Sequence, residues 1–172
     1  SGADTVCGVV PMFHAMGWGV PWAALMLGCK QVMPHRFMDP ARLMELMVAE
    51  GVTLSAGVPT IWQGVKSLYE ANPDAYDFSS LSRLTCGGSA PPPSLIRWFW
   101  DTLGVEMIHG WGMTETSPLA TLSRRVMKRS QLDISEDEQF ENVAKAVRSR
   151  HRLWRRAHVP CHGVGCALGS ID

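Results

Sequence analysis

Two short glycine-containing blocks hold the residue types with the clearest chemical potential. The first spans 87–93 and reads GGSAPPP; the second spans 109–118 and reads HGWGMTETSP. Each follows an apolar run typical of a buried strand. Glycine lets a backbone approach a flat ring closely, while a threonine beside a carboxylate can meet a phosphate and its metal ion. Either block alone means little, but together they predict one nucleotide pocket.

The elements that must position these blocks alternate along the chain. The pattern predicts strands over 5–11, 29–33, 52–56, 81–86 and, as the last one, 105–109, with helices over 18–27, 40–50, 59–71 and 93–103. Asp39 and Pro40 are typical of a helix start. Strands alternating with helices indicate an α/β fold with a largely parallel sheet, whose ligands bind at the carboxyl ends of the strands. Both blocks are therefore expected at the binding edge.

Length and composition narrow the function classes. The chain has 172 residues, 46% of them apolar and 19% charged, which is typical of one globular domain. No run of 18 apolar residues occurs, so we expect no membrane span, and the N-terminus does not resemble a signal peptide. The five cysteines form no C-x-x-C pair. We therefore expect reduced thiols and a cytoplasmic protein.

Four ordered blocks resemble the adenylate-forming acyl-CoA synthetases. They are VPMFHAMGW over 10–18, GVTLSAGVPTIW over 51–62, and the two glycine-containing blocks, so that the resemblance covers roughly residues 5–145. PMFH is similar to the fatty-acyl branch, and WGMTETSP is similar to methylthiopropionate-CoA ligases. The resemblance implies that residues 1–147 are the central part of an AMP-binding N-terminal domain, from an enzyme about three times this length.

The resemblance also implies roles for individual residues. The nucleotide would contact Gly87, Gly88, Ser89, Ala90, Trp111, Gly112 and Thr114, with Thr114 on the α-phosphate. The acyl substrate would contact His14, Trp18, Val58, Pro59 and Thr60, with His14 beside the reacting carboxylate and Trp18 at the entrance of the acyl tunnel. The implied catalytic residues are His14, Thr114 and Glu115, and Glu115 would also bind Mg²⁺.

The implied reaction converts a carboxylic acid, ATP and coenzyme A into acyl-CoA, AMP and pyrophosphate. The acid would be a medium- or long-chain fatty acid or methylthiopropionate, and a homodimer of the full-length enzyme stays open. The family's lysine-containing phosphate loop, its Tyr-x-Thr-Gly-Asp segment and its C-terminal lid are absent from these 172 residues. We therefore expect the isolated chain to be inactive.

Several of these residues also fit purely structural roles. A histidine such as His14 more often has a structural role, and a Gly-Gly pair usually forms a turn. Glu115 could interact favourably with the dipole at the start of a helix. Two alternative functions stay open for the chain: a non-catalytic nucleotide-binding or scaffold fragment, and an adenylating enzyme with another acyl acceptor.

Residues 148–172 form an atypical basic tail. Residues 1–147 contain 11 Lys and Arg against 15 Asp and Glu, whereas the tail contains five Arg against one Asp. The tail has neither strand nor helix periodicity, and it departs from the family pattern after an acidic helix over 135–145. We interpret it as frameshifted or disordered. Its Cys and His spacing does not favour zinc, and its lone Trp154 does not favour nucleic acid.

Overall fold

A computed structural model of the chain describes residues 2–35, 39–125 and 132–148. The strands are β1 (Thr5–Gly8), β2 (Lys30–Val32), β3 (Leu54–Gly57), β4 (Arg83–Cys86), β5 (Glu106–Gly112) and β6 (Leu119–Ser123). The helices are α1 (Ala15–Leu27), α2 (Pro40–Ala49), α3 (Pro59–Ala71), α4 (Pro93–Leu103) and α5 (Glu136–Arg148), with 3₁₀ turns at Pro73–Ala75 and Thr114–Thr116. The predicted α/β fold is confirmed. The basic tail lies outside the described residues, apart from Arg148 at its start.

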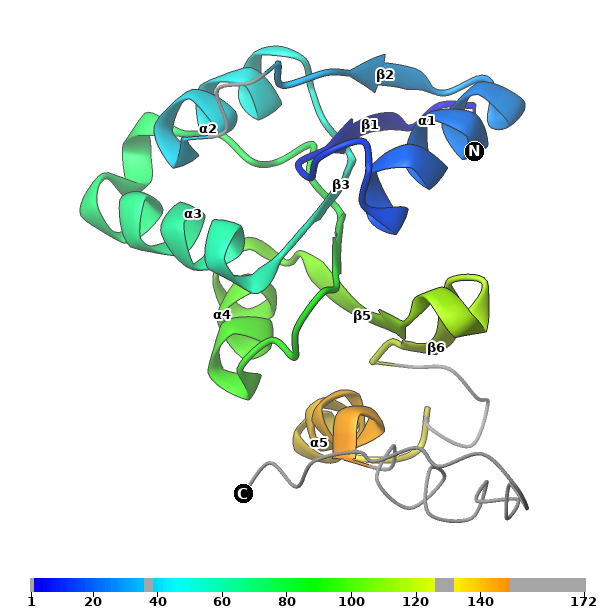
Figure 1. The fold of residues 1–172 in the computed structure, drawn as a ribbon. Coiled ribbons are helices and arrows are strands. Elements are labelled where there is room, and N and C mark those ends of the chain that lie inside the picture. The colour runs from blue at the N-terminus through cyan, green and yellow to red at the C-terminus, as the bar shows by residue number, and fades with distance from the viewer. Residues whose placement is uncertain (1, 36–38, 126–131, 149–172) are drawn as a thin grey trace.

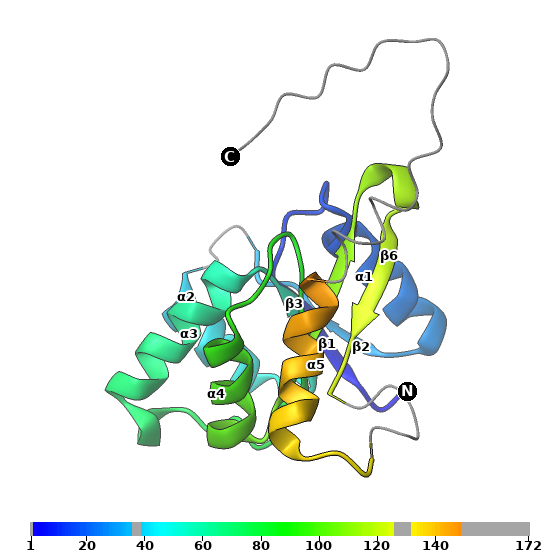
Figure 2. The ribbon, with the colours of Figure 1, turned by 90° about the horizontal axis from the view of Figure 1, so that it is seen from below.

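One sheet runs through the molecule in the order β2-β1-β3-β4-β5-β6. All its neighbouring pairs are parallel except β5 with β6. From β1 the chain crosses to β2 on one side and then returns past β1 to β3 on the other. Because such crossovers are right-handed, α1 covers one face of the sheet and α2, α3 and α4 cover the opposite face (Figures 1 and 2). The change of direction between β1 and β3 creates a crevice position typical of ligand sites.

Two element boundaries differ from the sequence predictions around Pro11. Strand β1 ends at Gly8 rather than at Pro11, although Val9 still donates to the Ala56 carbonyl over 2.7 Å. Pro11 has no N–H to continue the ladder, and its carbonyl instead accepts from the His14 N–H at 2.9 Å. This turn leads directly into α1, which begins at Ala15, three residues before the predicted start.

A strand after the second block was not predicted at all. Strand β6 pairs antiparallel with β5, with Trp111 opposite Thr121 and Gly110 opposite Leu122. A Cβ atom on Gly110 would lie 3.4 Å from Leu119 Cδ1, so the hairpin packs tightly over this glycine. The segment 119–123 mixes polar and apolar residues, and tertiary pairing rather than local pattern makes it a strand.

The core lies between the sheet and the α2–α4 face. Trp62 of α3, Phe99 of α4 and Leu84 of β4 are fully buried. The Trp62 and Phe99 rings meet edge to face with centroids 6.5 Å apart, and Trp98 meets Phe99 in the same way at 5.0 Å. As predicted, α2 begins at Pro40, where the Asp39 carboxylate accepts from the Arg42 N–H over 3.1 Å.

A polar network ties the amino ends of three strands together at the edge opposite to the predicted site. Asp4 Oδ1 accepts from Thr53 Oγ1 at 2.9 Å and from the Arg83 guanidinium at 2.7 Å. The Thr53 hydroxyl oxygen in turn accepts from the Thr5 N–H at 3.1 Å. The network therefore holds β1, β3 and β4 in register at their amino ends. It lies away from the carboxyl edge.

The aromatic core gives a direct stability test. Phe99→Ala should lower the free energy of unfolding by about 3–5 kcal/mol, because it removes a fully buried ring and leaves a cavity between Trp62 and Trp98. Urea denaturation followed by tryptophan fluorescence measures the change. Thr102→Ala, at an exposed position of the same helix, should shift stability by no more than about 0.5 kcal/mol. Equal effects of the two substitutions would contradict this description of the core.

Candidate functional site

The carboxyl ends of four neighbouring strands meet at one edge of the sheet. The parallel registers place Gly8 beside Ala56, Gly57 beside Cys86, and Cys86 beside His109. The segments that follow β1, β3, β4 and β5 therefore leave the sheet side by side, in that order. These segments, together with Trp111 and Gly112 at the end of β5, carry the residues that the sequence singled out.

The first block forms the connection from β4 to α4 and leans on the neighbouring strand end. The Gly87 N–H donates to the Gly57 carbonyl over 3.2 Å. Gly88 has φ +82°, a left-handed conformation that glycine adopts without strain, and a Cβ there would lie 3.3 Å from Val58 Cγ1. Ser89 and Ala90 follow as exposed residues. The block thus contacts the β3–α3 connection, with Gly87 buried and the bare backbone of Gly88 exposed to solvent.

Cys86 lies beneath this block as the last residue of β4. Its side chain is fully buried, and burial raises the pKa of the Cys86 thiol to about 12. The sulfur therefore stays protonated at neutral pH and is a poor nucleophile. Cys86 is therefore part of the hydrophobic core, and its thiol is poorly suited to covalent chemistry at neutral pH.

The strand before the second block continues further into the block than predicted. His109 belongs to β5 as predicted, but Gly110, Trp111 and Gly112 also belong to β5 rather than to a loop beyond it, because β6 pairs along them. A Cβ on Gly112 would lie 1.7 Å from the Pro118 carbonyl oxygen. This close approach requires a glycine whether or not a ligand binds. Trp111 is half-buried.

Thr114 and Glu115 lie on the 3₁₀ turn that joins β5 to β6, and both are exposed. The turn is fixed by Thr116, a residue that the sequence reasoning missed. Its hydroxyl accepts from the Met113 N–H at 3.0 Å and lies 2.8 Å from the Pro118 carbonyl oxygen, to which it can donate. A threonine bonding back to the backbone near a proline is a typical turn signal, and it was present in the TETSP segment.

The residues predicted for the acyl substrate lie on the β1 and β3 side of the edge. His14 comes just before α1 and is half-buried, whereas Trp18 is exposed on the first turn of the helix. Val58, Pro59 and Thr60 lie at the start of α3, where Pro59 is buried. Three strand intervals separate β1 from β5, which corresponds to about 14 Å. The residues predicted for the acyl substrate and the turn predicted for the phosphate therefore follow strands at a separation that one extended ligand can span.

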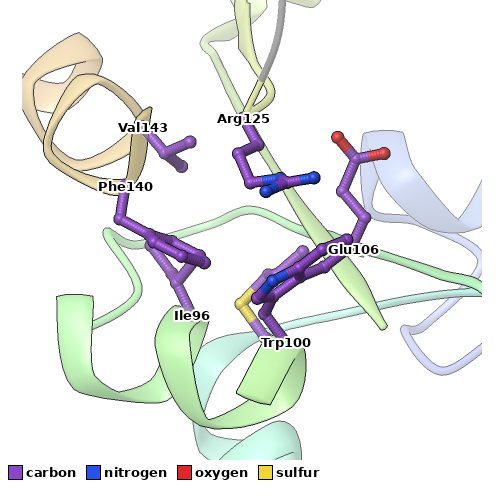
Figure 3. A pocket seen from close by; sticks show the side chains of 7 residues that line it. Ile96, Trp100, Glu106, Arg125, Phe140 and Val143 are labelled. Atoms are coloured by element: carbon purple, nitrogen blue, oxygen red, sulfur yellow. The ribbon is translucent and has the colours of Figure 1, made fainter. Parts of the chain in front are cut away.

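Two small pockets in the described part of the chain lie away from the Thr114 turn. One is lined by residues of α4, β5 and α5 together with Arg125, whose guanidinium carbon lies 3.8 Å from the centroid of the Trp100 ring (Figure 3). Arg125 also pairs with Glu136 over 2.8 Å. This pocket has room for about one water molecule, so we regard it as packing between α5 and the sheet. The other lies under α1, beside Val10, Met12 and Gly17.

The described residues contain no group of three or more His, Cys, Asp or Glu arranged to hold a metal ion. Glu115 is nevertheless an exposed carboxylate at the edge. Mg²⁺ commonly takes only one or two protein carboxylates and completes its ligands with phosphate oxygens and water. The donor set therefore fits a magnesium ion that arrives with a nucleotide. Within the same described ranges, none of the helices has the length and apolar run needed to cross a membrane.

Comparison with known proteins agrees with this geometry. The sequence profile of the "AMP-binding enzyme" family matches residues 1–147. The chain is 45% identical over 140 residues to a medium-chain-fatty-acid–CoA ligase of Ectopseudomonas oleovorans, covering 81% of this chain and 25% of that protein. It is 42% identical over 172 residues to a 3-methylmercaptopropionyl-CoA ligase of Ruegeria pomeroyi, covering 100% of this chain and 29% of that one.

A solved structure has a similar fold. The crystal structure of a long-chain-fatty-acid–CoA ligase from Archaeoglobus fulgidus superposes with a TM-score of 0.64 at 26% identity, covering 72% of this chain and 26% of that one. This chain therefore spans between a quarter and a third of the length of these three relatives. The profile match over most of the sequence, together with the two relatives above 40% identity, shows that the chain belongs to the family of AMP-binding enzymes.

Proposed function

We propose that this chain forms the nucleotide- and acyl-binding centre of an ATP-dependent acyl-CoA synthetase. In the parent reaction, a carboxylate oxygen of the acid attacks the α-phosphorus of ATP and pyrophosphate leaves. The thiol of coenzyme A then attacks the acyl carbon of the acyl-adenylate, and AMP leaves. The observation that carries the proposal is the register of β4 and β5, which puts the Gly87–Ala90 block beside the segment leading to Thr114.

The adenine-binding part of the proposed site is the first block. Gly87 is buried and bonded to Gly57, whereas Gly88 is exposed and close to Val58. The backbone at Gly88 can accept a ring face, because no side chain projects there. The half-buried Trp111 ring, on the adjacent strand, would supply an apolar wall.

The phosphate-binding part of the proposed site is the turn that carries Thr114 and Glu115. Negative charge builds up on the α-phosphate oxygens during attack, and donors fixed in advance at that position stabilise it. The Thr114 hydroxyl would donate to these oxygens. The Glu115 carboxylate would help to hold Mg²⁺, which supplies positive charge to the phosphates when bound.

The acyl-binding part of the proposed site is the crevice position between β1 and β3. His14 would lie beside the reacting carboxylate, while Trp18 and Val58 to Thr60 would contact the acyl chain. The relatives are named for medium-chain fatty acids, long-chain fatty acids and 3-methylmercaptopropionate. We propose a medium- or long-chain fatty acid or methylthiopropionate as the acid of the parent enzyme, together with coenzyme A as acceptor and a cytoplasmic location.

A second candidate is a non-catalytic nucleotide-binding fragment. The short span relative to the ligases favours it for the isolated chain, because three quarters of the length of the E. oleovorans relative has no counterpart in these 172 residues. Both candidates require AMP to bind at the edge, so binding experiments test their common basis.

Thr114 gives the sharpest test of the phosphate side. Thr114→Ala should weaken AMP binding about tenfold, because it removes a hydrogen bond to a charged group. It should leave adenosine binding unchanged, because adenosine has no phosphate. Isothermal titration calorimetry or NMR shifts at millimolar ligand measure both affinities. Thr114→Ser, which keeps the hydroxyl, is the control. An equal loss of AMP and adenosine affinity, or no saturable AMP binding by the unaltered chain, would contradict the proposal.

Glu115 should matter only when a metal ion is present. Glu115→Gln should reduce the gain in ATP affinity that Mg²⁺ provides, because a neutral amide is a weaker ligand for a hard cation. Binding of AMP in EDTA should stay unchanged. Titrations of ATP with and without Mg²⁺ measure the difference, and a variant with the full Mg²⁺ effect would remove Glu115 from the metal site.

Thr116 should act through the turn rather than through the ligand. Thr116→Val removes the hydroxyl that bonds Met113 and Pro118, so the turn carrying Thr114 loses its fixed geometry. AMP affinity should fall several-fold while adenosine affinity holds. Thr116→Ser should restore AMP affinity, since it keeps the hydroxyl. Failure of serine to rescue would show that the hydrogen bonds at 116 are not responsible.

A further inference from the structure

Strand β6 is the second arm of the hairpin whose turn carries Thr114, and little within the strand itself fixes its position. It lies at the edge of the described sheet and pairs there with β5 alone. Only Ser123 of its five residues is buried. The pairing is also irregular, because the register shifts between Trp111 and Gly112. Strand register is weakly specified where neither face is buried and where glycines take the place of side chains.

A shift of this register would rebuild the turn. In an antiparallel hairpin, each residue of β6 that slips along β5 is added to the connection or removed from it, and each step moves the strand by about 3.4 Å. The connection contains Thr114 and Glu115. Its shape depends on the hydroxyl of Thr116, which bonds to the backbone on both sides. The position of Thr114 therefore depends on what holds the other end of β6.

Two consecutive arginines follow β6 directly, and the first of them is bound to β5. Arg124 contacts Glu106, the first residue of β5, through two guanidinium nitrogens. Its Nε donates to Glu106 Oε1 over 3.2 Å, and a terminal nitrogen donates to Oε2. The Glu106 side chain is only 18% exposed. A two-point contact between a guanidinium and a carboxylate has a defined geometry, so it links the end of β6 to the start of β5 in one register.

The second arginine, Arg125, is fixed against two helices. Its guanidinium lies over the Trp100 ring of α4 and donates to Glu136 Oε1 of α5 over 2.8 Å (Figure 3 shows Arg125 with Trp100). The Trp100 Nε1–H donates to the same Glu136 oxygen at 3.3 Å. A cation is attracted both by the face of an aromatic ring and by a carboxylate. We define the β6 clamp as the two arginines with their partners: Arg124, Arg125, Glu106, Trp100 and Glu136.

We propose that Arg124 and Arg125 are positioning residues for nucleotide binding: by fixing the register of β6 on β5, they determine where Thr114 lies beside the first block. The inference rests on the proposed function, because it assumes that the turn contacts phosphate. The five residues of β6 span about 14 Å from first to last Cα and separate the arginines from the turn. An effect of either arginine on AMP binding would therefore pass through the geometry of the hairpin.

A purely structural role is the alternative, and the chain contains a matched arginine that represents it. Arg97 of α4 donates to Asp137 of α5 and lies 4.9 Å from the centroid of the Phe140 ring. These contacts have the same chemistry as those of Arg125, but they join α4 to α5 and include no residue of β6. Ion pairs near the surface contribute little to stability, so the clamp is better suited to orienting a strand than to stabilising the fold.

Substitution of the three arginines separates positioning from stability. Arg124→Gln and Arg125→Gln should each weaken AMP binding several-fold, because the turn loses its fixed position. Adenosine affinity should stay unchanged in both variants, because adenosine has no phosphate. Arg97→Gln should leave both affinities unchanged, although it removes an ion pair of the same type. Isothermal titration calorimetry measures the affinities, and urea denaturation should show similar, small losses of stability for all three variants.

Hydrogen exchange tests the register without any ligand. Arg124→Gln should speed the exchange of the backbone amides in β6 several-fold and leave those of β1 to β4 unchanged. The charge-reversed pair Glu106→Arg/Arg124→Glu should restore both slow exchange and AMP affinity, because it remakes the contact. Arg124→Lys keeps the charge but not the two-point geometry, so it should restore only part of each.

Failure of the inference differs from failure of the proposed function. If the unaltered chain binds AMP and both Arg124→Gln and Arg125→Gln keep that affinity, the inference is overturned and the proposed function stands. An equal loss of AMP affinity in Arg97→Gln, or an equal loss of AMP and adenosine affinity, would also overturn the inference, because it would indicate a general loss of structure. If the unaltered chain binds no AMP, the proposed function fails and the inference with it. Unchanged exchange of β6 in Arg124→Gln would overturn the inference whatever the titrations show.

Discussion

Parallel pairing between β4 and β5 is the constraint on which the candidate site depends. The pairing of Cys86 with His109 fixes where both connections leave the sheet. A slip of one residue would turn every side chain of a strand to the other face, burying polar groups and exposing Leu84 or Met107. The same core that stabilises the register thus sets the distance between the glycine block and the Thr114 turn. The β4–β5 pairing therefore determines both the packing of the core and the spacing of the two connections.

Much of the fold could be predicted because the local signals agree with the tertiary structure. Asp39, Pro40 and the apolar stripe of α2 mark one helix, and the runs before Cys86 and His109 mark buried strands. Strand β6 could not be predicted in this way. Its residues have no clear alternation, and they become a strand because β5 offers an open edge and because Gly110 and Gly112 permit close approach. The end of β1 depends similarly on a turn around Pro11.

The candidate site was predictable at the level of segments and less so at the level of residues. The sequence predicted that the connections after β4 and β5 lie at one edge of the sheet, because a glycine block follows each of two successive apolar runs, and the structure has this arrangement. Thr116 escaped prediction because its hydroxyl acts inward on the backbone rather than outward on a ligand. Gly112 was predicted as a ligand contact, whereas the crossing of the Pro118 carbonyl already demands a glycine. The structural requirement at Gly112 is therefore sufficient to explain the glycine.

The sulfur atoms at this edge differ in their vulnerability to oxidation. Cys86 is sealed beneath the first block as a neutral thiol, and thiols in that state react slowly with oxidants. Met113 is 39% exposed and adjoins Thr114. Peroxide would reach the methionine first, and its sulfoxide would place a polar, chiral group at the start of the turn. Oxidation would therefore alter the turn that carries Thr114 while leaving Cys86 unchanged.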